Sequence, residues 1–219
     1  MRVGVLASGE GTNLQALLDT VHGREVEIVA VASDQARARA LERARTAGVA
    51  TAAFERGGFP SRAARDAAIA DWLVERDAGL VVLAGYMAIL EDAFLERFAG
   101  RVVNVHPSLL PAFAGLRAIE QALAYGVKVF GVTVHYVEPG EVDSGPIILQ
   151  AAIELPGATD PAEVLAALRP LEHTLLPRAV ALIAGGAVRR DPDHPRRVVV
   201  GEAVGAASAG PTARGASPQ

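Results

Sequence analysis

The first 34 residues carry the pattern that most constrains what this chain can fold into. An apolar run at residues 3–7 is followed by the glycine turn SGEGTN at 8–13, and the next segment has apolar residues at helical spacing: Leu14, Leu17, Leu18 and Val21. A second apolar run, IVAVAS at 28–33, ends just before Asp34. A strand, a helix and a second strand in this order form a β-α-β unit. The pattern therefore predicts two parallel strands joined by a helix.

Alternating strands and helices continue to about residue 105 of the chain. Apolar runs that do not alternate with polar residues are typical of strands covered on both faces, and we expect such strands at 51–54, 80–84 and 102–105. Two gaps between them read as helices, at 35–47 and from the N-cap Ser61 to 77. The predicted fold class is α/β, an open and mostly parallel twisted sheet with helices on both faces.

The second half of the chain changes character. Two strands, at 127–137 and 146–155, are separated only by EPGEVDSG, which is too short for a crossover helix, so we expect antiparallel strands at one end of the sheet. A long helix begins at Asp160, with Pro161 in its first helical position. Its internal prolines, Pro170 and Pro177, should bend or divide it. Residues 188–200 read as two short exposed strands around a proline-rich turn.

Composition bounds the domain count and the class of protein. We expect a single domain at 1–202 and a disordered tail at 203–219, where Ala, Gly, Ser, Pro and Thr dominate. A formal net charge of −4 gives no positive field for nucleic acid or an anionic membrane, and the absence of cysteine excludes disulfides and thiolate chemistry. The longest apolar run, at 80–90, is too short to span a membrane, so a cytoplasmic protein is expected.

The glycine turn has the features of an anion site. Backbone N–H groups freed by Gly9 and Gly11 would converge with the helix dipole on a phosphate, and Thr12 and Asn13 can either cap the helix or bind the ligand. A dinucleotide fold, in which Asp34 would bind a ribose, is the competing interpretation, and Leu14 argues against it because that fingerprint requires Gly or Ala there. A purely structural turn also remains open.

A polar cluster is expected at the carboxyl edge of the sheet. Asn104 and His106 lie two residues apart on a strand, so they share a face, and Pro107 ends the strand. An amide and an imidazole suit a developing oxyanion, and Asp143 is the carboxylate best placed to set the charge of the histidine. The alternatives are loop-closing hydrogen bonds, or a metal site that adds His135. No ligand spacing supports that site, so no metal is predicted.

Several segments together resemble the folate-dependent formyl transferases. They are VGVLASGEGTN, VVLAGYMAIL, RVVNVHPSLLPAFAG, GVTVHYVEPGEVDSGPIILQ and LEHTLLP, and the likeness runs from about residue 1 to 190. The glycine turn narrows the resemblance to the branch that acts on phosphoribosylglycinamide. The resemblance implies a Rossmann-like fold and transfer of a formyl group from 10-formyltetrahydrofolate to the amine of phosphoribosylglycinamide in purine biosynthesis. Two relatives carry an additional nucleic-acid-binding or regulatory domain, and the length of this chain favours the smallest member.

The resemblance also implies roles for single residues. Asn104 matches the oxyanion donor, His106 the general acid, and Asp143 the carboxylate that raises the pKa of that histidine. The positions that match the phosphoribosylglycinamide site are Gly11, Thr12, Asn13 and Glu172. The positions that match the formyl-folate site are Arg62, Met87, Ala88, Ile89, Leu90 and Asn104.

Three departures from the pattern of relatives concern the folate site. Ala88 stands where several relatives have arginine, Arg117 where some have histidine, and the turn before Asp143 is one residue longer. Other functions remain open at this point: formyl transfer to another small amine such as an amino sugar, a dinucleotide-dependent oxidoreductase, or a binding module without catalysis. Small-molecule substrates are expected, without nucleic-acid or membrane partners, in a monomer or homodimer.

Overall fold

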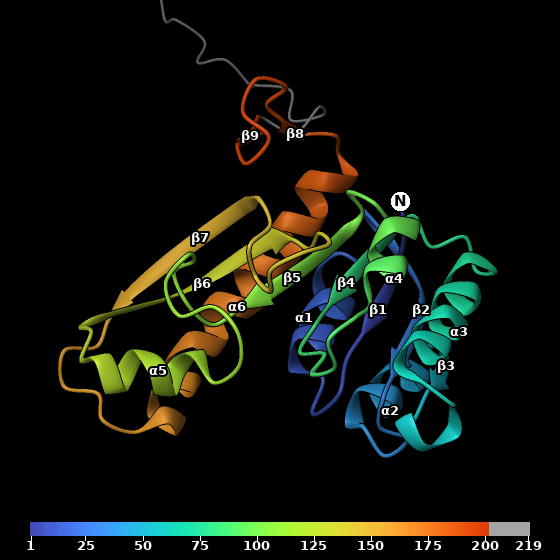
Figure 1. The fold of residues 1–219 in the computed structure, drawn as a ribbon, viewed down its shortest axis with the longest axis horizontal. Coiled ribbons are helices and arrows are strands. Elements are labelled where there is room, and N and C mark those ends of the chain that lie inside the picture. The colour runs from blue at the N-terminus through green and yellow to red at the C-terminus, as the bar shows by residue number, and fades with distance from the viewer. Residues whose placement is uncertain (202–219) are drawn as a thin grey trace, which may run out of the picture.

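The structure, a computed structural model, describes residues 1–201, and the tail expected at 203–219 lies outside the described residues. Seven strands form one sheet in the order β3-β2-β1-β4-β5-β6-β7 (Figure 1). The first five strands in this order, β3, β2, β1, β4 and β5, are parallel to their neighbours, whereas β6 runs antiparallel to both β5 and β7. The strands are β1 Arg2–Leu6, β2 Glu27–Ser33, β3 Ala50–Ala53, β4 Leu80–Leu83, β5 Val102–His106, β6 Val129–Tyr136 and β7 Ile147–Glu154. The predicted class, with antiparallel strands at one end, is confirmed.

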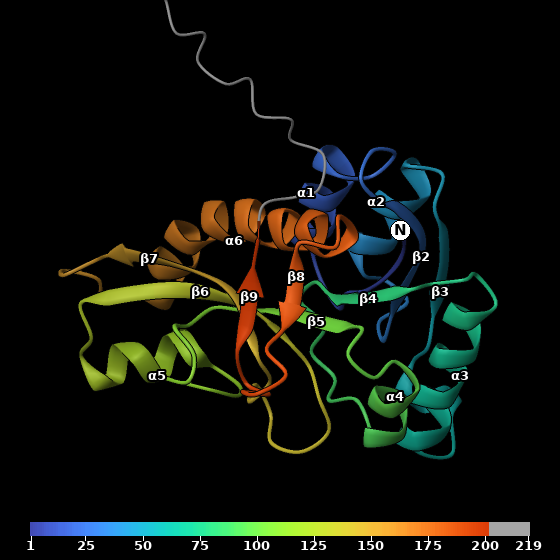
Figure 2. The same cartoon turned by 90° about the horizontal axis from the view of Figure 1, so that it is seen from above.

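Helices cover both faces of the sheet (Figure 2). One buried cluster packs leucines of α1 and α6 against the sheet, and a second packs α3 and α4 against the opposite face. The predicted cap Ser61 is present, since its Oγ accepts from Ala64 N, and Asp160, where the long helix was expected to begin, caps it by accepting from Ala162 N through Oδ1. The helices are α1 Thr12–Thr20, α2 Arg39–Thr46, the 3₁₀ turn η1 Arg56–Gly58, α3 Arg62–Val74, α4 Asp92–Arg97, α5 Ala118–Tyr125 and α6 Pro161–Ala184.

The helix expected at 35–47 begins only at Arg39, because residues 35–38 form a turn in which Ala38 N donates to the carbonyl of Gln35. Of the two effects expected from Pro170 and Pro177, division of the helix does not occur, because α6 runs unbroken through both. A proline inside a helix costs about 3 kcal/mol, and each fully buried leucine contributes about 1.5–3 kcal/mol. The buried apolar face of α6, which includes Leu168, Leu175 and Leu176, offsets the cost of the prolines.

The last described element is a hairpin of β8 Val188–Arg190 and β9 Val198–Val200, which pair antiparallel as predicted. It follows α6 and packs beside β7. Within residues 1–201, no helix is long and apolar enough to cross a membrane.

The loops that follow β1, β4 and β5 all leave the same edge of the sheet, because these strands are parallel. Two hydrogen bonds join the first two of these loops: Ser8 N donates to Gly85 O over 3.0 Å, and Met87 N donates to Ser8 Oγ over 2.8 Å. The carboxyl edge is where open α/β sheets bind ligands. The fold therefore places the glycine turn, the 84–91 loop and the end of β5 together.

Candidate active site

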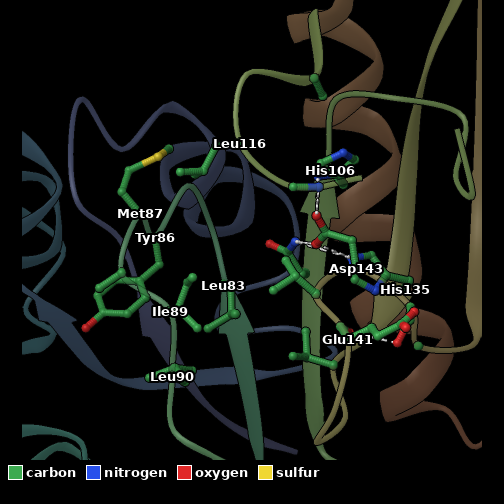
Figure 3. A pocket seen from close by; sticks show the side chains of 18 of the residues that line it. Leu83, Tyr86, Met87, Ile89, Leu90, His106, Leu116, His135, Glu141 and Asp143 are labelled. Atoms are coloured by element: carbon green, nitrogen blue, oxygen red, sulfur yellow. Dashed lines mark hydrogen bonds and ion pairs between the residues drawn. The ribbon is translucent and has the colours of Figure 1, made fainter. Parts of the chain in front are cut away.

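A cavity of about 640 Å³ opens at this edge of the sheet. Figure 3 shows apolar side chains on one wall, among them Met87, Ile89 and Leu90, and a polar cluster around Asp143 on the other. A cavity of this size that combines an apolar wall with a few convergent polar groups is typical of a site for a small organic ligand.

The polar cluster contains the three residues singled out for chemistry. Asp143 Oδ2 lies 3.2 Å from His106 Nδ1, and Asn104 Nδ2 donates to Asp143 Oδ1 over 3.4 Å. The backbone N–H of Gly115 donates to the same carboxylate over 2.8 Å. Strand β5 supplies the amide and the imidazole, and the loop between β6 and β7 supplies the carboxylate. The structure thus brings together side chains that are 37–39 residues apart.

His106 ends β5 with both ring nitrogens next to acceptors. Its Nε2 lies 3.0 Å from the carbonyl oxygen of Phe113, and its Nδ1 faces the carboxylate of Asp143. Because carbonyls and carboxylates only accept hydrogen bonds, both contacts favour the doubly protonated imidazolium. Burial acts against the charge and prevails, so the pKa of His106 lies below its ordinary value. Asp143 thus acts in the expected direction, but the expected net rise in pKa is not found.

The Asp143 carboxyl has a lowered pKa. Burial alone would raise this pKa, but the neighbouring His135 and His106 and the N–H of Gly115 stabilise the anion and reverse the shift. The residue has a left-handed backbone with φ of 56°, which is uncommon outside glycine. A charged acceptor is thereby held against the imidazole of His106.

His135 belongs to the cluster and was not predicted as a site residue. It lies opposite Asn104 across the β5–β6 pair, is fully buried, and places Nε2 3.3 Å from Asn104 Nδ2 and 3.5 Å from Asp143 Oδ1. Its Nδ1 lies 2.8 Å from the carbonyl oxygen of Tyr136. The only signal for this role is the cross-strand register, which requires the exact pairing of two antiparallel strands. Within residues 1–201, no three or more His, Cys, Asp or Glu side chains form a group that could hold a metal ion.

The glycine turn is packed against the start of α2. Gly11 has φ of 69°, and a Cβ on it would lie 2.6 Å from Ala40 Cα. Ala40 N donates to Gly9 O over 3.1 Å, and Arg43 Nε donates to Glu10 O over 2.8 Å. Glycine is required here by both the backbone conformation and the close approach.

Asn13 and Glu172, both predicted to bind the substrate, contact each other. Asn13 Nδ2 donates to Glu172 Oε2 over 3.0 Å, and both side chains are buried. Burial raises the pKa of Glu172, and the hydrogen bond from Asn13 opposes the rise. Gly11 is the N-cap of α1 and no side chain caps the helix, so a capping role for Thr12 or Asn13 is wrong. The predicted substrate residues Gly11, Thr12, Asn13 and Glu172 do not line the cavity itself. The hydrogen bonds of Ser8 join the glycine turn to the 84–91 loop, which does line it.

All six predicted folate positions line the cavity. Met87, Ala88, Ile89 and Leu90 form its apolar wall, Arg62 lies on its rim, and Asn104 belongs to the polar cluster. Met87 and Ile89 leave 66% and 50% of their surface exposed, so the wall offers apolar surface that a flat ligand can cover. Arg62 forms an ion pair with Glu91 on the rim, and Arg117 also lines the cavity.

Known proteins resemble this chain in sequence. The formyl transferase family matches residues 1–180. Phosphoribosylglycinamide formyltransferase of Haemophilus influenzae is 40% identical over 190 residues, covering 86% of this chain and 89% of that protein. The trifunctional purine biosynthetic protein adenosine-3 of Drosophila pseudoobscura pseudoobscura is 43% identical over 193 residues, and this chain spans 14% of its length.

Solved structures give the same result. The crystal structure of glycinamide ribonucleotide transformylase 1 from Symbiobacterium toebii matches with a TM-score of 0.86 and 45% identity, over 92% of this chain and 94% of that one. Phosphoribosylglycinamide formyltransferase from Anaplasma phagocytophilum matches with a TM-score of 0.84 and 38% identity, over 91% and 94%. The chain therefore belongs to the formyl transferase family.

Proposed function

We propose that this protein transfers the formyl group of 10-formyltetrahydrofolate to the amine of phosphoribosylglycinamide, a step of purine biosynthesis, and that residues 1–202 act as a single domain. One observation carries the proposal: the His106 imidazole and the Asp143 carboxylate lie 3.2 Å apart beside Asn104, in a cavity with an apolar wall. Relatives of similar length are named for this reaction.

The apolar wall at residues 87–90 suits the flat pterin of the donor. A pterin also needs hydrogen bonds along its edge, which the backbone of this loop and of residues 140–143 can supply. The glutamate tail of a folate is anionic, and Arg62 and Arg117 are the cations on the cavity rim that can meet it.

The acceptor would bind through the glycine turn and Glu172. Backbone N–H groups at the start of α1 can hold the phosphate, and the Glu172 carboxylate can accept from the glycinamide. Asn13 Oδ1 is buried and has no hydrogen-bond partner within residues 1–201, so it can accept a further bond from the ligand.

The chemistry is a direct acyl transfer. The amine of the acceptor attacks the formyl carbon, and the electron pair of the carbonyl moves to its oxygen. Asn104 and protonated His106 would hold the oxyanion. To do so, Asn104 would turn one amide N–H from His135 Nε2 to the oxyanion while the other faces Asp143, and His106 would turn its Nε2–H away from Phe113 O. The carbon–nitrogen bond to the folate then breaks, N10 of the folate takes a proton from His106, and the attacking nitrogen releases one to restore it.

The test uses purified protein with both substrates and follows deformylation of the folate. We expect turnover only when 10-formyltetrahydrofolate and phosphoribosylglycinamide are both present, with formylated acceptor as the product. Formylation of an amino sugar in preference to phosphoribosylglycinamide would overturn the acceptor assignment. Tight binding of a nicotinamide cofactor without formyl transfer would instead favour the dinucleotide-dependent alternative.

A further inference from the structure

The loop that carries Asp143 is held at one end and exposed in its middle. It connects β6 to β7, and at its end Gly145 lies so close to the preceding strand that a Cβ would come within 1.8 Å of Tyr136 O. Val142, next to Asp143, leaves 51% of its surface exposed. Backbone packing therefore fixes the return into β7 but leaves the 138–144 segment dependent on other contacts.

The hairpin of β8 and β9 supplies such contacts. Arg190 forms an ion pair with Glu138, and its guanidinium carbon lies 4.8 Å from the centre of the Tyr136 ring. Arg196 Nη2 donates to the carbonyl of Ser144 over 2.8 Å. These two arginines thus contact the loop five residues before Asp143 and at the residue directly after it. Figure 2 shows the hairpin beside the loop between β6 and β7.

The hairpin is itself a defined structure. Asp191 N donates to Arg197 O over 2.9 Å, Asp193 N donates to Asp191 Oδ1 over 3.0 Å, and Gly201 N donates back to Ala187 O over 2.8 Å. These bonds close the turn and the base of the hairpin, and Ala187 N donates to the carbonyl of Leu182 in the last turn of α6 over 2.9 Å, which fastens the hairpin to that helix. The arginines therefore extend from a fixed support to the loop.

We infer that the β8–β9 hairpin is a positioning element, in which Arg190 and Arg196 hold the 138–144 loop so that Asp143 meets His106. The inference rests on the proposed function, because it concerns the geometry of that active site. The hairpin lies beyond residue 180, where the match to the family ends, so family membership alone does not imply this role.

The solvent exposure of the Arg190–Glu138 ion pair allows a role in positioning Asp143 to be distinguished from a role in stabilising the fold. The Arg190 and Glu138 side chains are each about one-third exposed, and ion pairs of this kind add little to the stability of a fold. A small displacement of a catalytic group, by contrast, lowers turnover strongly. Loss of either arginine should therefore reduce turnover more than it reduces thermal stability.

The experiment compares Arg190→Met and Arg196→Met with Arg189→Met. Methionine has an unbranched side chain of similar length to arginine but lacks the charge and the N–H donors of the guanidinium group. Arg189 lies on the same strand as Arg190, and its side chain makes no hydrogen bond or ion pair within residues 1–201. We expect kcat to fall about 3- to 30-fold in the first two variants, with the control unchanged and the melting temperatures of all three close to that of the wild type.

Two further readouts identify the cause. If Asp143 moves from His106, burial of the imidazole is less opposed, its pKa falls, and kcat declines from a lower pH than in the wild type. Arg196→Lys, which can still donate to Ser144 O, should recover part of the lost turnover. Unchanged kcat and pH profile in both methionine variants would overturn the inference, as would equal losses in the Arg189 control. An inactive wild-type protein would instead refute the proposed function.

Discussion

Asn13 donates a hydrogen bond of 3.0 Å to the carboxylate of Glu172, although 159 residues separate them in the chain. The bond joins the first turn of α1 to the middle of α6, two helices that pack against each other. It therefore places the Glu172 carboxylate next to the glycine turn, so that the turn and Glu172 together form the proposed site for the acceptor.

Glu172→Gln tests this unit through pH-dependent stability. Burial raises the pKa of Glu172 in the folded protein above its unfolded value, so this group favours folding below the unfolded pKa and loses that contribution as the pH rises through the folded pKa. Glutamine keeps an oxygen that accepts from Asn13 and carries no charge. We expect the variant to unfold at higher urea than the wild type at neutral pH, and the difference to vanish in acid.

The same variant should weaken binding of the acceptor. A hydrogen bond to a charged group contributes about 1.5–3 kcal/mol, so KM for phosphoribosylglycinamide should rise about 10- to 100-fold. KM for the folate serves as the internal control and should stay unchanged. Glu163→Gln, at the exposed start of α6, should alter neither KM. An acceptor KM that is the same in Glu172→Gln and the wild type would remove Glu172 from the substrate site.

Asp143→Asn removes the charge that opposes burial of His106. The amide oxygen can still accept from Gly115 N, so the fold should persist, but the pKa of His106 should fall and the imidazolium become scarce. We expect kcat to drop about 10²- to 10⁴-fold, measured in steady state with both substrates. Asp160→Asn, which keeps the N-cap of α6, is the matched control. Normal turnover of Asp143→Asn would exclude the carboxylate from catalysis.

His135, which the sequence suggested only as part of an alternative metal site, tests whether a buried neighbour supports the active site. Phenylalanine fills similar volume but leaves Asn104 Nδ2 without the ring nitrogen 3.3 Å away and Tyr136 O without a partner at 2.8 Å. Each buried polar group left without a partner costs about 1–3 kcal/mol, so His135→Phe should melt at a lower temperature. Because Asn104 and Asp143 both lose a neighbour, kcat should fall about 10-fold or more.

The conservative variant separates position from volume. His135→Gln offers an amide that can face Asn104 or Asp143, and it should retain more turnover than His135→Phe. Thermal melting and the two KM values complete the comparison. If His135→Phe were folded and had the kcat of the wild type, the contacts of His135 would be structural only.

Local patterns predicted much of this fold. The first β-α-β unit, the antiparallel end of the sheet and the 188–200 hairpin each follow from apolar runs and connection lengths within a few dozen residues. Asn104, His106 and Asp143 could be proposed because strand periodicity and the carboxyl-edge rule act locally.

The elements that were missed depend on distant contacts. Helix α4 has only six residues, and the side chain of its N-cap residue, Glu91, makes no capping hydrogen bond. Instead, Glu91 N donates to Asp66 Oδ2, 25 residues earlier in the chain. Helix α5 begins after Arg117, which has a left-handed backbone that arginine does not favour. No local sequence signal reports the contact of Glu91 with Asp66 or the left-handed backbone of Arg117. The same holds for the position of His135 opposite Asn104 on the neighbouring strand.

Gly11→Ala tests the glycine turn that the acceptor phosphate would occupy. Alanine would have to adopt φ of 69° and place its Cβ 2.6 Å from the backbone of Ala40, so either the turn or the start of α2 must shift. Strain of this kind costs about 1–3 kcal/mol. We expect a lower midpoint of urea unfolding and, because the N–H groups of the turn are displaced, a higher KM for phosphoribosylglycinamide.

The matched control for this change is Gly57→Ala in the exposed η1 turn. A Cβ on Gly57 meets no atom within 4 Å, and its φ is not left-handed, so its free energy of unfolding should change by about 0.5 kcal/mol or less. Equal unfolding midpoints for the two variants would show that the turn is not held against Ala40. A destabilised Gly11→Ala protein with the wild-type KM for phosphoribosylglycinamide would separate the packing of the turn from phosphate binding, and would move the phosphate to another part of the carboxyl edge.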